Sequence, residues 1–140
     1  MVNNTMKTKW IKMYLDIASR LAEESHATRL KVGAVFVSES GVMSTGINGL
    51  PAGGSNVCER DNKTLPEVSH AEEAVLTKLL KQGVSTDGGY IFCTHSPCIN
   101  CAKLMANSGI KEVWYLDDYK NSYGIDYMSM FGVHVNKFVS

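Results

Sequence analysis

Two short stretches constrain this chain of 140 residues more than any other part of it. They are Ser69-His70-Ala71-Glu72 and Pro97-Cys98-Ile99-Asn100-Cys101. Serine is a good N-cap and proline is favoured at the first helical position, so Ser96 and Pro97 predict a helix that begins at Pro97. Cys98 and Cys101 would then point from one face of its first turn, where both thiols can reach one metal ion.

The residue types in these stretches are those of a catalytic zinc site. The positive end of a helix and a metal ion both favour the thiolate form of cysteine, which is the form that binds zinc. His70 would be the third ligand. Three protein ligands leave a fourth tetrahedral position open, and this open position separates a catalytic zinc from a structural one. Glu72 would remain free to transfer protons.

Each stretch alone has a simpler interpretation. Ser69-x-x-Glu72 has the spacing of a capping box, in which Glu72 only satisfies a backbone N–H at a helix start. Cys98-x-x-Cys101 after a strand is also typical of a thioredoxin-like redox pair, and a structural zinc module would use the same thiols. The two stretches together favour the catalytic site, because His-x-Glu followed by Pro-Cys-x-x-Cys is the signature of zinc nucleobase deaminases.

Composition indicates a soluble globular protein with a small substrate. The chain is 44% hydrophobic and 20% charged, and no apolar run approaches the roughly 20 residues of a membrane span. Residues 1–7 lack the apolar core of a signal peptide, so we expect a cytoplasmic protein, in one domain over 1–140, with no membrane partner. Four cysteines do not make a disulfide framework. Fourteen basic and 14 acidic residues give no electrostatic footprint for a long nucleic acid.

Hydrophobic spacing predicts an α/β fold. Helices are expected over 7–24, 70–82, 97–107 and 122–131, and strands over 32–37, 42–48, 90–94, 112–116 and 134–138, the last of them an edge strand. Gly83 is a plausible helix end. The segment 49–69 has no regular periodicity, and a loop of this length is usually functional or mobile. The alternation predicts a three-layer α/β/α domain around a mixed five-stranded sheet.

Beyond the zinc signature, nearly the whole chain resembles the cytidine deaminase superfamily, and within it the deoxycytidylate (dCMP) deaminases. The resemblance rests on the stretches Val32-Gly-Ala-Val, Ser44-Thr-Gly-Ile-Asn-Gly-Leu-Pro-Ala-Gly-Gly54, Ser96-Pro-Cys-Ile-Asn-Cys-Ala-Lys103 and Ser108-Gly-Ile-Lys-Glu-Val113. It implies a cytidine deaminase-like fold and hydrolytic deamination of dCMP to dUMP and ammonia. Glu72 would be the catalytic acid and base beside one Zn²⁺ held by His70, Cys98 and Cys101.

The resemblance also implies residues that bind the nucleotide. Asn48 would hydrogen-bond the sugar, and Arg29 would contact the phosphate. The peptide N–H groups near Ala71 and Cys98 could hold the zinc-bound oxygen and the carbonyl of the ring. Each residue has a simpler interpretation, because Asn48-Gly49 is a common turn and Arg29 alone is usually a solvated surface residue.

Regulation by nucleotides is a further implication. Enzymes of this type are commonly homohexamers that are activated by dCTP and inhibited by dTTP. The candidate effector element is the loop with Gly53, Gly54 and Asn56, whose small residues let backbone groups approach a triphosphate and its Mg²⁺. The alternative is a mobile surface loop without a ligand.

The chain departs from its relatives at two places. Many relatives bind a second, structural zinc through cysteines at the positions of Ala27 and Cys58 and through ligands just before the catalytic histidine. Ala27 and Val68 occupy two of these places here, with His26 only as a neighbour, so a second zinc is not expected. Relatives also tend to have asparagine at the position of Ala74. A deaminase of another base or nucleoside, guanine or tRNA adenosine included, remains the closest alternative enzyme, although the balanced charge weighs against tRNA.

Overall fold

The computed structural model describes residues 6–139. Its elements are α1 (Thr8–Ala22), β1 (Gly33–Val37), β2 (Met43–Ile47), β3 (Glu59–Arg60), β4 (Lys63–Thr64), α2 (Ala71–Gln82), β5 (Tyr90–His95), α3 (Ile99–Asn107), β6 (Glu112–Asp117), α4 (Tyr123–Met130) and β7 (His134–Lys137). Within the described residues, no helix combines the length and the apolar character needed to cross a membrane.

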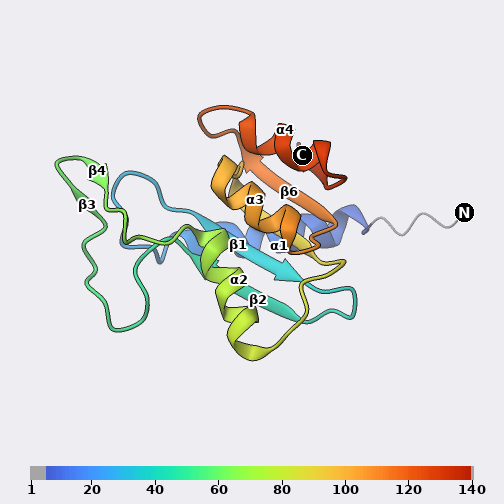
Figure 1. The fold of residues 1–140 in the computed structure, drawn as a ribbon, viewed down its shortest axis with the longest axis horizontal. Coiled ribbons are helices and arrows are strands. Elements are labelled where there is room, and N and C mark those ends of the chain that lie inside the picture. Colours follow the sequence, from blue (N-terminus) through green and yellow to red (C-terminus); the bar gives the residue numbers. More distant parts are fainter. Residues whose placement is uncertain (1–5, 140) are drawn as a thin grey trace, which may run out of the picture.

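The central sheet contains five strands in the order β2-β1-β5-β6-β7 (Figure 1). β1 is antiparallel to both β2 and β5, whereas β6 is parallel to both β5 and β7. The prediction of a mixed five-stranded sheet is therefore confirmed, and β7 forms one of its edges as its alternating pattern indicated. The parallel half of the sheet brings the ends of β5 and β6 side by side. Residues at and just after these two ends line the cavity described for the site.

Helices cover both faces of the sheet, as the three-layer prediction required. On one face, Ile11 and Leu15 of α1 pack against Val35 and Phe92. The opposite face is covered by α2, α3 and α4, whose buried side chains form a continuous core with Phe36, Ile91 and Val113. Burying one such side chain contributes about 1.5–3 kcal/mol, so these two apolar clusters hold the layers together.

The start of α3 differs from its prediction. The helix begins at Ile99 with Cys98 at its N-cap, not at Pro97 with Ser96 as the cap. The Ser96 hydroxyl instead accepts a hydrogen bond from the Tyr119 backbone N–H at 2.8 Å, so a partner distant in sequence competes successfully for it. The end of α2 is as predicted, because Gly83 takes a left-handed conformation with φ of 69°.

The segment 49–69 contains structure that its composition did not predict. β3 and β4 pair as a short hairpin whose two turn residues, Asp61 and Asn62, both have positive φ. Asp and Asn tolerate this conformation, which two-residue hairpin turns require. The two ends of the segment also meet, because Gly49 and Ser69 exchange both backbone hydrogen bonds, at 3.0 and 2.9 Å. Ser69 directly precedes His70, so this bridge lies beside the site.

Candidate active site

Three predicted metal ligands come together at the starts of two helices. His70 is the N-cap of α2, Cys98 is the N-cap of α3, and Cys101 lies in the first turn of α3. The His70 Nδ1 atom is 3.2 Å from the Cys101 Sγ and 3.5 Å from the Cys98 Sγ. Among residues 6–139 this is the only group of three potential ligands whose atoms lie within 4.8 Å of one another. These nitrogen and sulfur atoms are the donors that zinc prefers.

Contacts among His70, Cys98 and Cys101 shift the pKa values of all three side chains. The hydrogen bond with Cys101, together with one from His70, lowers the pKa of Cys98 to about 3. The hydrogen bond between Cys98 and Cys101 raises the pKa of Cys101. The separate hydrogen bond between Cys98 and His70 raises the pKa of His70 to about 8. The thiolate form of Cys98 is therefore favoured, with the protons on Cys101 and His70. A bound divalent cation would replace these protons and favour two thiolates and a neutral imidazole.

Glu72 lies within the first turn of α2 and is only 4% exposed. Burial away from water raises the pKa of its carboxyl group to about 7. It does not cap the helix, because Glu73 accepts the hydrogen bond from the His70 backbone N–H at 2.8 Å. The capping-box alternative for Ser69 and Glu72 is therefore wrong. The capping carboxylate is the next residue along, which leaves Glu72 available for chemistry.

A cavity of about 200 Å³ opens beside these residues. Its wall contains the metal-ligand candidates His70 and Cys98, the carboxylate of Glu72, and the following further residues: Arg29, Leu30, Val32, Asn48, Thr64, Val68, Ala71, His95, Ser96 and Tyr119. The wall combines apolar surface with a few polar groups, as is usual for a small-molecule site.

Asn48 contributes its side chain to this wall, whereas Ala71 contributes backbone. The Asn48 side chain accepts a hydrogen bond from the Val32 N–H at 2.9 Å and donates one to the Leu30 carbonyl at 2.7 Å. An amide group has further hydrogen-bonding capacity beyond these two bonds. The fold therefore fixes the orientation of Asn48 and leaves it able to bind a ligand. Ala71 is fully buried and contributes backbone at the first position of α2.

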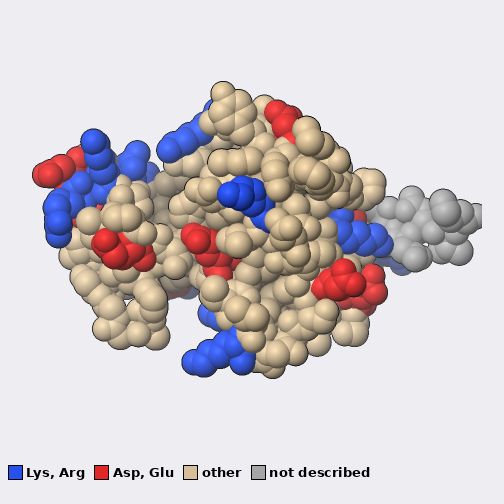
Figure 2. Space-filling model, in the orientation of Figure 1, with Lys and Arg blue, Asp and Glu red and all other residues tan. Residues whose placement is uncertain are grey.

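Arg29 lies at the exposed end of the cavity. Its guanidinium donates to the Thr64 hydroxyl at 3.3 Å, and the Glu59 carboxylate accepts hydrogen bonds from the backbone N–H groups of Thr28 and Arg29 at 3.0 and 3.2 Å. These contacts tie the segment with Arg29 to the β3–β4 hairpin. Figure 2 shows lysine and arginine side chains gathered at this end of the molecule, with acidic side chains beside them. Arg29 is the arginine in the cavity wall, and a cation at a cavity favours an anionic ligand.

The loop proposed for an effector does not line this cavity. Gly53, Gly54 and Asn56 are all exposed, and the cavity wall includes none of them. Gly53 has φ of 88°, and the Gly54 N–H donates to the Pro51 carbonyl at 2.9 Å. The loop is thus a surface turn that connects to Asn48 along the chain.

The positions considered for a second zinc form an apolar cluster instead. Ala27, Cys58 and Val68 are buried together, with Leu50 and Leu65 packed against them. Burial raises the pKa of the Cys58 thiol. Side-chain packing therefore holds this part of the 49–69 segment.

Sequence reasoning did not identify His95, Ser96 and Tyr119 as part of the site. His95 and Ser96 directly precede the Pro-Cys stretch and could have been found by their position. Tyr119 follows β6 and reaches the cavity because β5 and β6 are parallel neighbours, with His95 opposite Asp117. No sequence signal in the region of Tyr119 reports this neighbour.

Comparison with known proteins agrees with the geometry. The family described as "Cytidine and deoxycytidylate deaminase zinc-binding region" matches residues 8–117. The chain is 33% identical to ComE operon protein 2 of Bacillus subtilis, over 94% of this chain and 72% of that protein. It is 36% identical to the deoxycytidylate deaminase of Mycobacterium phage D29, over 76% and 93% of the two chains.

A solved structure is similar over almost the whole chain. The dCMP deaminase of cyanophage S-TIM5, in complex with dCMP and dUMP, has a TM-score of 0.91 and 39% sequence identity. The similarity covers 96% of this chain and 100% of the cyanophage chain.

Proposed function

Because the chain belongs to the cytidine and deoxycytidylate deaminase family, whose zinc-binding region it matches over residues 8–117, we propose that it hydrolyses dCMP to dUMP and ammonia in the cytoplasm. The observation that carries the proposal is the group of His70, Cys98 and Cys101 beside the buried carboxylate of Glu72. The cyanophage dCMP deaminase that binds dCMP and dUMP supports the choice of substrate.

The metal site fits one catalytic zinc. His70, Cys98 and Cys101 would hold the ion. When bound, zinc acts as a Lewis acid that lowers the pKa of a bound water to about 7.

Glu72 performs the proton transfers in this proposal. Its carboxylate accepts a proton from the attacking water and donates a proton to ring nitrogen 3 of cytosine, which makes carbon 4 more electrophilic. In a second transfer, Glu72 takes the proton of the hydroxyl group added at carbon 4 and gives it to the amino group, which leaves as ammonia while the carbon 4 carbonyl forms. A pKa of about 7 suits this double role, because the group can both accept and donate a proton near neutral pH. Its burial keeps bulk water from competing.

Other wall residues would bind and orient the nucleotide. Asn48 is held by Leu30 and Val32 and presents its remaining amide capacity to the sugar. Arg29 lies in the cavity wall and would bind the 5′-phosphate. The backbone N–H groups at the starts of α2 and α3, near Ala71 and Cys98, would stabilise developing negative charge, as helix N-termini do.

An assay with the purified protein tests the substrate directly. Ammonia release is measured with dCMP, CMP, deoxycytidine, dCTP, cytosine, guanine and adenosine, and metal content is recorded for the same preparation. We expect one zinc per chain and the highest kcat/KM with dCMP. A higher kcat/KM with guanine or adenosine would contradict the proposal, and metal without ammonia release would favour a structural zinc module.

We further propose that the enzyme is a homohexamer activated by dCTP and inhibited by dTTP, each bound with Mg²⁺. The loop with Gly53, Gly54 and Asn56 is the candidate effector element. The support for this role is the path of the chain. The 49–69 segment begins next to Asn48 and ends next to His70, and backbone hydrogen bonds between Gly49 and Ser69 join its two ends. An effector that prefers one arrangement of this segment would change the site by linkage, typically by about 1–3 kcal/mol.

Kinetics and light scattering test the regulation separately from the chemistry. The proposal predicts sigmoidal dCMP kinetics that become hyperbolic with dCTP and more sigmoidal with dTTP, in an oligomer. A monomer with hyperbolic kinetics that neither nucleotide changes would exclude the regulation and leave the catalytic proposal intact.

A further inference from the structure

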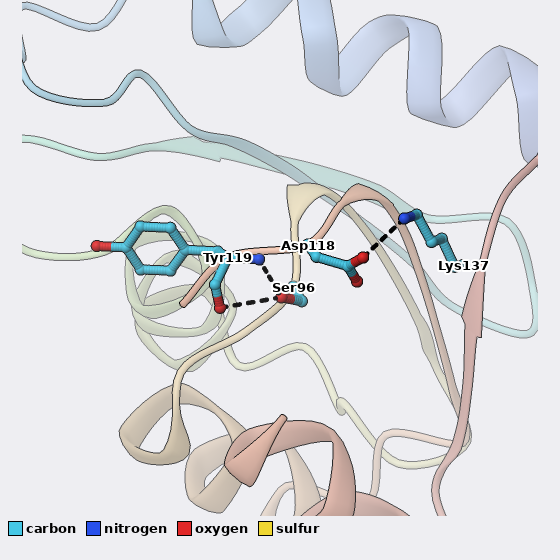
Figure 3. A network of polar contacts seen from close by, with 4 residues as sticks. All are labelled: Ser96, Asp118, Tyr119 and Lys137. Carbon is cyan, nitrogen blue, oxygen red and sulfur yellow. Dashed lines mark hydrogen bonds and ion pairs between the residues drawn. The ribbon is translucent and has the colours of Figure 1, made fainter. Parts of the chain in front are cut away.

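Ser96 connects the Pro-Cys stretch to the segment that follows β6. Its side chain is almost completely buried, at 4% exposure. Its backbone N–H donates to the Asp117 carbonyl at 2.9 Å. Its hydroxyl accepts a hydrogen bond from the Tyr119 N–H at 2.8 Å and donates one to the Tyr119 carbonyl at 3.5 Å (Figure 3). One residue therefore holds this segment at two points.

The held segment carries an aromatic side chain of the cavity wall. Tyr119 lines the same cavity as Cys98 and Glu72. Its ring packs edge-on against His95, with centroids 6.4 Å apart and an interplanar angle of 78°. The next residue, Lys120, has φ of 56°, so the backbone changes direction immediately after the ring. The position of the ring thus depends on how the backbone of Tyr119 is anchored.

The other anchor of this segment is weaker. Asp118 forms an ion pair with Lys137 of β7 at 2.7 Å (Figure 3), but their side chains are 68% and 43% exposed. Exposed ion pairs contribute little because water and salt screen them. The buried hydroxyl of Ser96 bonds to the peptide groups themselves, without screening of this kind. Ser96 is therefore the anchor on which the Tyr119 backbone depends.

We propose that Ser96 is a positioning residue that holds the Tyr119 ring at the cavity wall, where the ring contacts the bound nucleotide. This inference rests on the proposed function and assigns a role to two residues of that site. Aromatic rings bind the faces of nucleobases, so a displaced ring would weaken substrate binding. Proton transfer by Glu72 would continue, because neither residue contacts its carboxylate through a hydrogen bond in the structure. The expected signature is a change in KM with little change in kcat.

Steady-state kinetics of Ser96→Ala with dCMP test the proposal. The matched control is Lys137→Met, which removes the ion pair that β7 makes with Asp118 of the same segment. Loss of one net hydrogen bond corresponds to an increase in KM of about three- to tenfold, with kcat within about twofold. Lys137→Met should leave both parameters unchanged. In a Tyr119→Ala background, Ser96→Ala should add no further increase in KM. An unchanged KM, or an equal increase in the Tyr119→Ala background, would overturn the proposal.

Two measurements without turnover complete the test. Hydrogen exchange of the peptide 117–122 should be faster in Ser96→Ala than in the wild type and in Lys137→Met, and equal exchange would overturn the proposal. Zinc content should stay at the wild-type value, because loss of metal would mean that Ser96 supports Cys98 instead of Tyr119. If the wild type releases no ammonia from dCMP, the proposed function fails, whereas exchange still decides whether Ser96 anchors the segment.

Discussion

Replacing Glu72 by glutamine separates proton transfer from every other role of this position. The amide has the shape of the carboxyl group but cannot act as an acid or base near neutral pH. The helix cap is untouched, because Glu73 and not Glu72 accepts the hydrogen bond from the His70 N–H. The metal-ligand candidates are also untouched, since they are His70, Cys98 and Cys101.

The expected loss of rate is large. General acid–base catalysis contributes about 10²–10⁴-fold, which corresponds to about 3–5 kcal/mol of transition-state stabilisation. Glu72 is 4% exposed, so buffer or bulk water has little access to replace it. We therefore expect kcat to fall by at least about a hundredfold. Stability should not fall, because burial already disfavours the charged carboxylate and raises its pKa to about 7.

The assay combines ammonia release under saturating dCMP with zinc content and thermal unfolding. Glu73→Gln is the matched control, because it makes the same chemical change one residue away and keeps an acceptor for the His70 N–H. It should retain activity within about threefold. Near-normal activity of Glu72→Gln, with zinc bound, would refute the assignment of Glu72 as the acid and base. Cys101→Ala should differ from both by losing metal and activity together.

Three further substitutions address substrate binding, metal number and support of the site. Arg29→Ala should weaken dCMP binding by about 1.5–3 kcal/mol and barely change activity on deoxycytidine; an equal loss on both would make Arg29 structural and Lys31 the next candidate for the phosphate. Cys58→Ser should leave zinc at one per chain by metal analysis, because its neighbours are apolar, and a fall from two to one would contradict this. Gly124→Ala should lower zinc affinity in chelator competition, since the added Cβ would lie 2.9 Å from the Cys98 carbonyl carbon, and unchanged affinity would show that α4 can shift without moving Cys98.

Much of this protein follows from local signals that the sequence carries. The apolar spacing of residues 7–24 predicted α1, which the structure has as Thr8–Ala22, and Gly83 ends α2 because a glycine accepts the left-handed conformation. Both signals involve residues that lie only a few positions apart, so they can be recognised without knowledge of the fold. The three metal-ligand candidates were also found from spacing and donor chemistry, since each of the two stretches begins a helix.

Tertiary structure decided which of several local options each polar residue takes. Ser96 has the chemistry of an N-cap, but its hydroxyl bonds to Tyr119, which only the parallel pairing of β5 and β6 brings near. Glu72 has the spacing of a capping residue, but Glu73 takes that place and Glu72 lies buried beside the metal-ligand candidates. Tyr119, the partner of Ser96, lies 23 residues along the chain, which is too far for a local pattern to report. The choice between Glu72 and Glu73 as the capping carboxylate depends on the residue at which α2 begins in the fold, and that residue has His70 as its N-cap. The grouping of His70, Cys98 and Cys101 could therefore be predicted from sequence, whereas the aromatic part of the cavity wall could not.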